Sequence, residues 1–158
     1  MLVVSDTSPV TNLLQIDQLD LLRLLFGEII VPESVFAELY ELPRQRVALD
    51  SESWIHIQLV TQPELVGALQ AELDAGEAEA IALAVELKAD YLLIDERKGR
   101  AKAESLGLRI VGLLGILVQA KRSGHIPMVE PLLLDLRQKA GFRIHPDLYK
   151  RVLQAAGE

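Results

Sequence analysis

The sequence predicts an α/β fold, a three-layer α/β/α sandwich in which helices cover both faces of a central, mainly parallel sheet. Short apolar segments alternate along the chain with longer segments of helical periodicity, and this order of elements builds parallel sheets. The first short segment, residues 2–5, is apolar up to its final serine, as expected of a strand buried on both faces. Half of the 158 residues are hydrophobic, so we expect a single domain with a sizeable core over residues 1–158.

In the first half of the chain, prolines, glycines and periodicity define the predicted elements. Ser8 is expected to be the N-cap of the helix after the first strand, with Pro9 at its first position. Alternating apolar and polar residues over 54–60 predict a half-exposed edge strand. The predicted order is a strand at 2–5, a helix from 9 to 16, a helix at 17–26, a strand at 28–31, a helix from 32 that ends at Pro43, a loop at 44–52 and the edge strand.

The second half continues the alternation of helices and strands. Glycines and prolines again separate the segments, because they interrupt both helices and sheets. The predicted order is helices at 63–73 and 77–87, a strand at 91–94, a basic helix at 97–106, a strand at 109–111 and a helical remainder from 113 with breaks at Gly124, Pro127, Gly141 and Pro146.

Composition excludes several classes of protein. The chain has no cysteine, which excludes disulfides, thiolate zinc sites and a cysteine nucleophile. The three histidines are scattered without the spacing of metal ligands. No apolar run is long enough to cross a bilayer, and the opening MLVVSDTS lacks the features of a secretory signal, so we expect a cytoplasmic protein with no membrane partner. The net charge of −7 counts against a nucleic-acid partner, since nucleic-acid binders usually carry a basic surface.

Four acidic residues are expected to gather at one edge of the sheet. Asp6 and Asp95 each follow an apolar strand, Glu38 lies on an otherwise apolar helix face, and Glu77 opens the helix that leads to Asp95. The carboxyl ends of parallel strands meet at one edge, where ligands bind. Carboxylates that converge there repel one another unless a cation lies between them. The sequence therefore predicts a metal site with oxygen ligands, which suits Mg²⁺ or Mn²⁺.

Each acid also has a purely structural interpretation. Asp6 and Asp95 suit helix or turn caps, Glu38 suits an ion pair with an arginine, and Glu77 suits the positive end of a helix dipole. Glu79 follows two residues later on the same helix and suits a solvated position equally well.

Several segments resemble the motifs of PIN domains, and together they span nearly the whole chain. The first motif is an aspartate after the first strand with small polar residues and an asparagine behind it, and the second is V-P-x-x-V-x-x-E. The third is an acid that opens an alanine-rich helix, and the fourth is a strand that bears the last acid. A branch of PIN-like proteins without assigned function supplies further likeness. The four motifs lie, in order, at 4–12, 31–39, 76–84 and 91–95. The likeness to the branch without assigned function lies at 95–100 with 112–115 and at 141–144.

The resemblance implies a function and a set of site residues. PIN domains are typically metal-dependent ribonucleases, many of them VapC-type toxins that pair with an antitoxin protein and form homodimers. By resemblance, Mg²⁺ or Mn²⁺ would be held by an acidic quartet, and small polar side chains would brace those acids. The quartet is Asp6, Glu38, Glu77 and Asp95, and the bracing residues are Asn12 with Ser8 or Thr7. Glu79 competes with Glu77 for the place of the third acid, and the spacing to Asp95 suits Glu77 better.

Three basic residues and two other functions complete the predictions. Arg97, Lys98 and Arg100 follow Asp95 directly and are expected to hold the RNA backbone. The alternative within the family is a non-catalytic binding or regulatory subunit. A phosphatase of the haloacid dehalogenase kind needs a second aspartate two residues after Asp6, where this chain has a serine. No G-x-x-x-x-G-K-[ST] sequence supports a phosphate-binding loop.

Overall fold

The computed structural model describes residues 1–158, and a five-stranded parallel sheet forms its centre. The strand order is β3-β2-β1-β4-β5, and every neighbouring pair is parallel. The central strand β1 places Val4 opposite Ile30 of β2 and Leu92 of β4. The strands are β1 (Val3–Ser5), β2 (Ile29–Pro32), β3 (Ile55–Gln58), β4 (Tyr91–Leu93) and β5 (Ile110–Val111). The predicted α/β class is confirmed, and so is the edge position of the strand predicted within residues 54–60.

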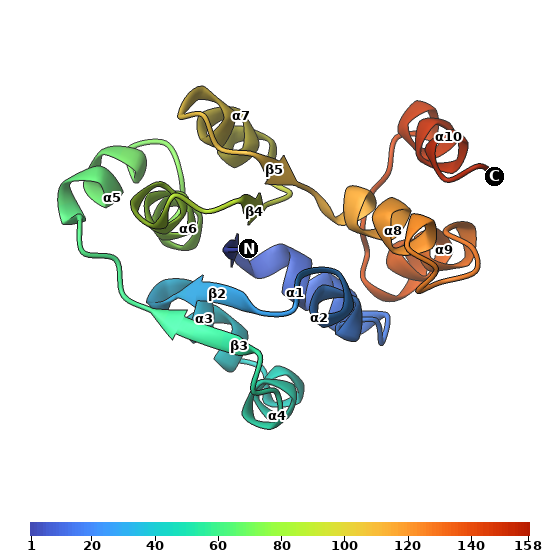
Figure 1. The fold of residues 1–158 in the computed structure, drawn as a ribbon, viewed down its shortest axis with the longest axis horizontal. Coiled ribbons are helices and arrows are strands. Elements are labelled where there is room, and N and C mark those ends of the chain that lie inside the picture. Colours follow the sequence, from blue (N-terminus) through green and yellow to red (C-terminus); the bar gives the residue numbers. More distant parts are fainter.

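Ten helices surround this sheet and make three layers (Figure 1). In that view α5 and α6 lie to the left of the sheet, and α1, α2, α8 and α9 lie to its right. The helices are α1 (Thr7–Gln15), α2 (Asp20–Phe26), α3 (Glu33–Tyr40), α4 (Pro43–Ser51), α5 (Pro63–Leu69), α6 (Ala75–Leu87), α7 (Arg97–Ser105), α8 (Leu113–Arg122), α9 (Glu130–Lys139) and α10 (Pro146–Ala155). None of these helices is long and apolar enough to cross a membrane.

Helix α6 is the most deeply buried helix and holds one layer against the sheet. It contacts β1, β2 and β4 on one side and α3, α5 and α7 on its others. All residues from Ala80 to Ala84 are fully buried, as is Ala78, because small side chains let neighbouring elements approach on several faces of the helix. The first turn of α6 is consequently fixed in place near the carboxyl ends of β1 and β4.

Several predicted boundaries are wrong. Asp6, and not Ser8, is the N-cap of α1, so the helix begins two residues before Pro9. Helix α2 begins at Asp20, because Asp17 has a positive φ of 57° and cannot continue a helix there. Helix α6 begins before Gly76, at Ala75. Helix α5 ends at Leu69, four residues short of its predicted end.

The predicted loop at 44–52 is also wrong, since these residues form most of α4. Pro43 begins this helix instead of ending the previous segment, because a proline at the first helical position has no N–H that the helix needs. The Arg46 side chain donates to the carbonyl oxygens of Tyr40 (2.6 Å) and Glu41 (3.1 Å). Leu49 is buried. Because this segment contains few apolar residues, it lacks the periodic pattern that predicts a helix, and only a few contacts anchor it.

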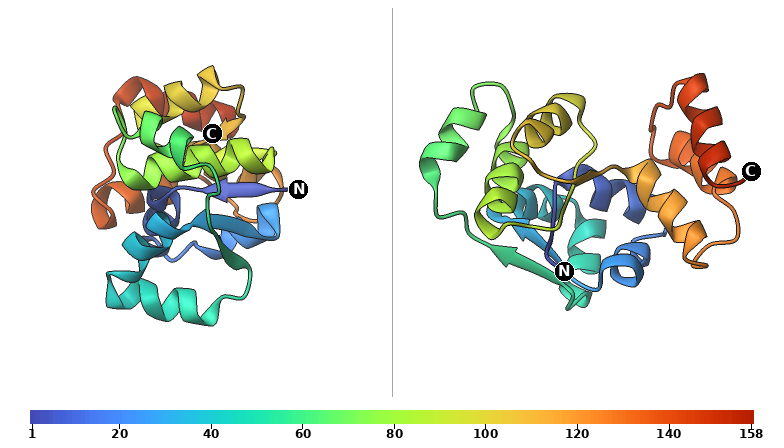
Figure 2. Two further views of the ribbon diagram at one scale, coloured as in Figure 1. Left: turned by 90° about the vertical axis from the view of Figure 1, so that its left-hand side faces the viewer. Right: turned by 45° about the horizontal axis from the view of Figure 1, so that its top comes forward.

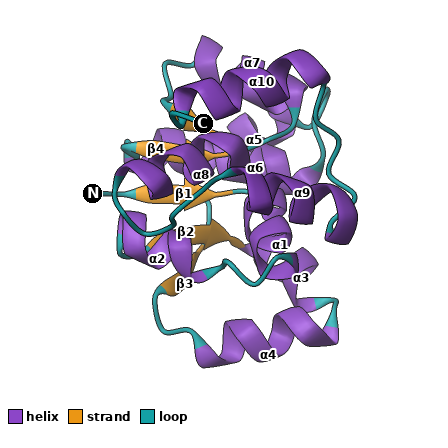
Figure 3. Ribbon diagram, turned by 90° about the vertical axis from the view of Figure 1, so that its right-hand side faces the viewer, coloured by secondary structure: helices purple, strands orange, loops and turns teal.

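The C-terminal helices extend the molecule away from the sheet. In Figure 2 the segment from α8 to α10 forms one end of the molecule, and the chain begins near its middle. Figure 3 shows the short strands enclosed by helices, with α4 at the opposite end of the sheet from α7 and α10. The region between α7, α8 and α10 therefore lies beyond the β5 edge.

Candidate acidic site at the carboxyl ends of the strands

Two neighbouring strands place Asp6 and Asp95 at one edge of the sheet. Ser5 and Leu93 are paired across β1 and β4, and the backbone N–H of Asp6 donates to the Leu93 carbonyl at 2.9 Å. Asp6 is buried, with 5% of its surface exposed. Its backbone is extended as the N-cap of α1, but its side chain makes no capping hydrogen bond. Capping therefore does not account for this buried carboxylate.

Glu38 approaches from α3 and is bound to the start of α1. The Thr7 hydroxyl donates to Glu38 Oε2 at 2.8 Å. A Cβ atom on Gly76 would lie 2.8 Å from Glu38 Oε1, so a side chain at this position would require the Glu38 carboxylate to move. Glu38 is exposed, unlike its helix neighbours Val35 and Leu39, which are fully buried. The acid thus lies at the rim of the apolar face.

The two glutamates of α6 point to different partners. Glu79 accepts from the Ser34 backbone N–H at 3.3 Å and from the Ser34 hydroxyl. Glu77 has no such partner and interacts electrostatically with Asp74 and Asp6. Glu77, not Glu79, is therefore the α6 glutamate whose pKa the charge of Asp6 raises.

Asp74 is an acid of this region that the sequence analysis missed. It is the N-cap of α6, and its side chain accepts from the Glu77 backbone N–H at 2.8 Å. Its charge raises the pKa of both Asp6 and Glu77. The segment Asp-Ala-Gly-Glu has the spacing of a capping box, and that pattern could have identified both the cap and the start of α6.

Burial and mutual repulsion favour protonated acids. For Asp6, burial is the main reason that its pKa rises to about 7, the Thr7 backbone N–H opposes the rise, and Asp74, Glu38 and Asp95 add to it. Burial likewise raises the pKa of Glu77 to about 7, with further contributions from Asp74 and Asp6. A cation between these groups would reverse the preference.

Asp95 has one bonded and one unbonded carboxylate oxygen. Oδ1 accepts from the Leu113 backbone N–H at 2.7 Å, whereas Oδ2 is buried without a hydrogen-bond partner. Burial raises the pKa of Asp95, and the Leu113 N–H and the Arg100 guanidinium oppose that rise. A Cβ atom on Gly112 would lie 3.2 Å from Asp95 Oδ1 and would clash with Arg100 Nη1. Gly112 thus leaves space for both groups.

The chemistry of these donors fits a hard divalent cation, although their present positions do not form a closed site. No three acidic or histidine side chains are arranged closely enough to hold a metal ion. The donors are all carboxylate oxygens, which Mg²⁺ and Mn²⁺ prefer. A buried, unpaired oxygen on Asp95 is costly unless it acquires a partner.

The remaining predicted residues have different surroundings. Ser8 and Asn12 are half-buried, and neither side chain is bonded to an acid, whereas the Thr7 hydroxyl is. Arg97 and Lys98 are exposed at the start of α7. Arg100 is half-buried and donates to the Ile94 carbonyl at 3.3 Å. Of the three basic residues, Arg100 alone is partly buried and bonded to the backbone of the protein.

Comparison with known proteins adds one finding. A family model, DUF3368, described as a PIN domain, matches residues 2–158. No curated protein matches the chain.

Proposed function

Because the chain belongs to the PIN-domain family, whose members are generally nucleases, we propose that it is a divalent-metal-dependent endoribonuclease that hydrolyses RNA phosphodiester bonds. One observation carries the proposal: two acids with pKa values of about 7, Asp6 and Glu77, lie at the edge where Asp95 keeps an unpaired buried oxygen. A cluster of acids whose charged forms are this unfavourable without a cation is typical of a cation-binding site.

Asp6, Glu38, Glu77 and Asp95 would hold the metal, either Mg²⁺ or Mn²⁺, directly or through water. When bound, such an ion polarises the phosphoryl oxygen, lowers the pKa of water and neutralises charge on the leaving oxygen. The supporting residues orient the acids: the Thr7 hydroxyl fixes Glu38, and the Leu113 N–H fixes Asp95. Asp74 adds negative charge beside Asp6 and Glu77 and would strengthen cation binding.

Basic residues near the acids would position the substrate. Arg97 and Lys98 are exposed at the start of α7 and are free to contact phosphates. Arg100 has a second role in the proposal. Its bond to the Ile94 carbonyl fixes its position, and its positive charge opposes the rise in the pKa of Asp95. We therefore assign to Arg100 the role of favouring the charged form of Asp95.

The finer proposal is that this nuclease is the toxin of a toxin–antitoxin pair, with an antitoxin partner and a homodimeric state. The likeness of its motifs to those of VapC-type toxins supports this. The separation of the acids and the net charge of −7 favour a second candidate, a non-catalytic nucleic-acid-binding or regulatory subunit. A cleavage experiment separates the two.

The test is cleavage of a pool of structured and unstructured RNAs with Mg²⁺, Mn²⁺ or EDTA. The wild-type chain should cut only with metal, and Asp6→Asn should lower the rate by at least about a hundredfold, because a metal ligand contributes several kcal/mol to the transition state. Cutting by Asp6→Asn at the wild-type rate would expose a contaminating nuclease. Silence from both proteins would support the non-catalytic subunit.

A matched pair of variants tests the choice of third acid. Glu77→Gln should abolish cutting, and Glu79→Gln should retain it, because Glu79 is engaged with Ser34. The reverse result would transfer the role to Glu79. Circular dichroism melts of both variants would show whether a loss of cutting reflects unfolding.

A further inference from the structure

A groove of about 980 Å³ lies between α7, α8 and α10 and begins at the acidic site. Asp95 and Arg100 line one end of it, where Gly112 and Leu113 start α8. The opposite wall comes from α10 and the segment before it, which contribute Phe142 and Leu148. An occupant of this groove would therefore extend directly to Asp95.

The groove concentrates positive charge in an acidic protein. Five of the ten arginines of the chain line it, namely Arg97, Arg100, Arg122, Arg143 and Arg151. Only two acids do so, Asp95 and Glu104, although the chain has 23 acidic and 16 basic residues. None of the five arginines forms an ion pair within the protein. The excess charge is thus available to an anionic partner.

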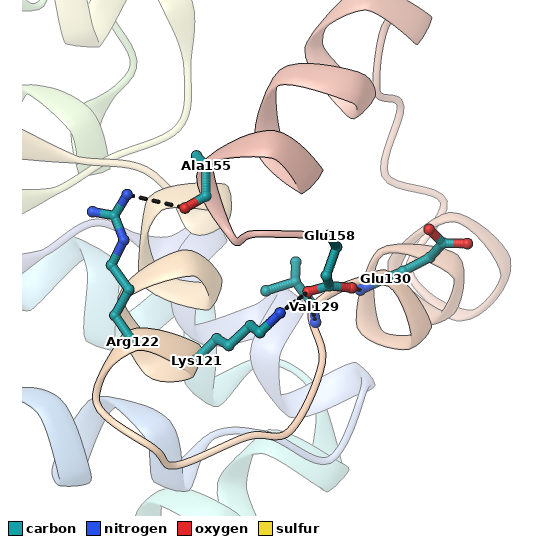
Figure 4. A network of polar contacts seen from close by, with 6 residues as sticks. All are labelled: Lys121, Arg122, Val129, Glu130, Ala155 and Glu158. Atoms are coloured by element: carbon teal, nitrogen blue, oxygen red, sulfur yellow. Dashed lines mark hydrogen bonds and ion pairs between the residues drawn. The ribbon is translucent and has the colours of Figure 1, made fainter.

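Polar contacts hold α10 in position as a wall of the groove (Figure 4). The Glu158 carboxylate accepts from the backbone N–H groups of Val129 (2.7 Å) and Glu130 (3.1 Å) and from Lys121 Nζ (3.0 Å). Arg122 Nη2 donates to the Ala155 carbonyl at 3.0 Å. One groove arginine therefore helps to fix the wall.

We infer that this groove binds the phosphate backbone of a single-stranded nucleic acid and leads the strand to the acidic site. The inference deepens the proposed function and rests on it. Arginine forms paired hydrogen bonds with phosphate oxygens. The apolar walls and the ring of Phe142 suit bases that are free to stack, as they are in a single strand and not in a duplex. An acidic peptide would pair with the arginines, but its carboxylates would not stack on the Phe142 ring.

The test measures binding without cleavage. The full-length protein in EDTA is titrated against a short fluorescein-labelled oligouridine, and anisotropy is recorded over a series of KCl concentrations. Arg143→Gln/Arg151→Gln should weaken binding by about tenfold or more, because charge-assisted hydrogen bonds are lost. The slope of log affinity against log salt should fall by about 0.7 for each phosphate contact removed.

The control pair removes equal charge elsewhere. Arg44 is an exposed residue of α4, and Arg109 is exposed before β5, at the opposite edge of the sheet from the acids. Arg44→Gln/Arg109→Gln should bind like wild type. Both pairs consist of exposed residues, and matched circular dichroism melts would show that the folds are intact.

Three outcomes would overturn the inference. The first is equal binding by the groove pair and the control pair. The second is tighter groove-dependent binding of a duplex of the same length, and the third is groove-dependent binding of poly-L-glutamate without binding of the oligouridine. Because binding is measured in EDTA, a protein that never cuts RNA but binds the strand through the groove would refute the nuclease and leave the groove assignment standing.

Discussion

Gly112 and Gly115 lie three residues apart at the start of α8 but have different surroundings. A Cβ atom on Gly112 would clash with Arg100 Nη1 and press on Asp95 Oδ1, whereas one on Gly115 would meet only Val111 Cγ1 at 3.5 Å. Space, and not backbone conformation, restricts Gly112, since its φ is −92°. The glycine pair in the sequence therefore combines one position of close approach with one ordinary helical position.

Gly112→Ala should consequently lower the free energy of unfolding by about 1–3 kcal/mol, because overpacking forces neighbouring groups to move. The neighbours here are Arg100 and Asp95, so RNA cleavage should fall as well. Gly115→Ala is the matched control and should raise stability by up to about 1 kcal/mol through helix propensity. Urea titrations of both variants measure this difference, and equal effects would contradict the role of Gly112.

The positions of the acids could be predicted from the sequence better than their contacts. Asp6 and Asp95 follow apolar strands, and parallel pairing brings such residues to one edge whatever the helices do. Asp74 was missed because the role of an acid in a loop depends on the helix that it caps, and the start of α6 was predicted at the wrong residue. The inward turn of Arg100 was not predictable either, because it depends on the space left by a glycine twelve residues away.

At the scale of elements, α10 is joined to the rest of the molecule by the buried Val152 in its middle and by polar contacts at its C-terminal end. The Glu158 side chain, 7% exposed, bonds to the start of α9 and to Lys121 of α8. Arg137 of α9 lies 5.3 Å from the centroid of the Tyr149 ring. Desolvation raises the pKa of Glu158, but the Val129 and Glu130 N–H groups and the Lys121 ammonium together lower it below its ordinary value.

Glu158→Gln should reduce stability by about 1–2 kcal/mol, since hydrogen bonds to a charged group are replaced by weaker ones. The folded-state pKa of Glu158 is lowered, so its stabilisation is complete above the unfolded value and is lost as pH falls through the folded value. The loss of stability caused by Glu158→Gln should therefore be smaller at acidic pH. Glu72, an exposed residue with no side-chain bond, provides the control Glu72→Gln, and hydrogen exchange of α10 would localise the effect.

Element types were largely predictable, and the exceptions have physical causes. Strands and most helices follow from apolar periodicity and from glycine and proline positions. Helix α4 was mistaken for a loop because it buries little and is held by Arg46 bonds to a preceding turn. Such tertiary anchoring leaves no periodic pattern in the sequence. The groove was not predictable at all, since its arginines are spread over residues 97–151.

For the whole molecule, we expect the acidic site to make stability depend on pH and, under the proposed function, on metal. The folded-state pKa of Asp6 is raised to about 7, so the folded state holds a proton that the unfolded state releases near pH 4. Without metal, the free energy of unfolding should therefore fall as pH rises from about 4 to about 7 and stay low above that. For Asp6 alone, the decrease is at most about 4 kcal/mol.

Mg²⁺ or Mn²⁺ should raise the melting temperature more at about pH 8 than at about pH 5, because metal and protons compete for the same oxygens. At a metal concentration of about a hundred times Kd, the gain is about 2.7 kcal/mol. Asp6→Asn should be more stable than wild type at the higher pH without metal and should lose the response to metal. Thermal melts in metal and in EDTA at both pH values check this, and an unchanged metal response in the variant would refute the assignment of Asp6.

The pairing of β1 with β4 also sets when the acidic site can exist. Val3 pairs with Tyr91, and Asp95 is held by Leu113, so residues from both ends of a span of more than a hundred positions must be present together. Contacts this distant in sequence form late in folding. A ribosome making this chain thus releases most of it before the four acids can meet, so an incomplete copy lacks the assembled acidic cluster.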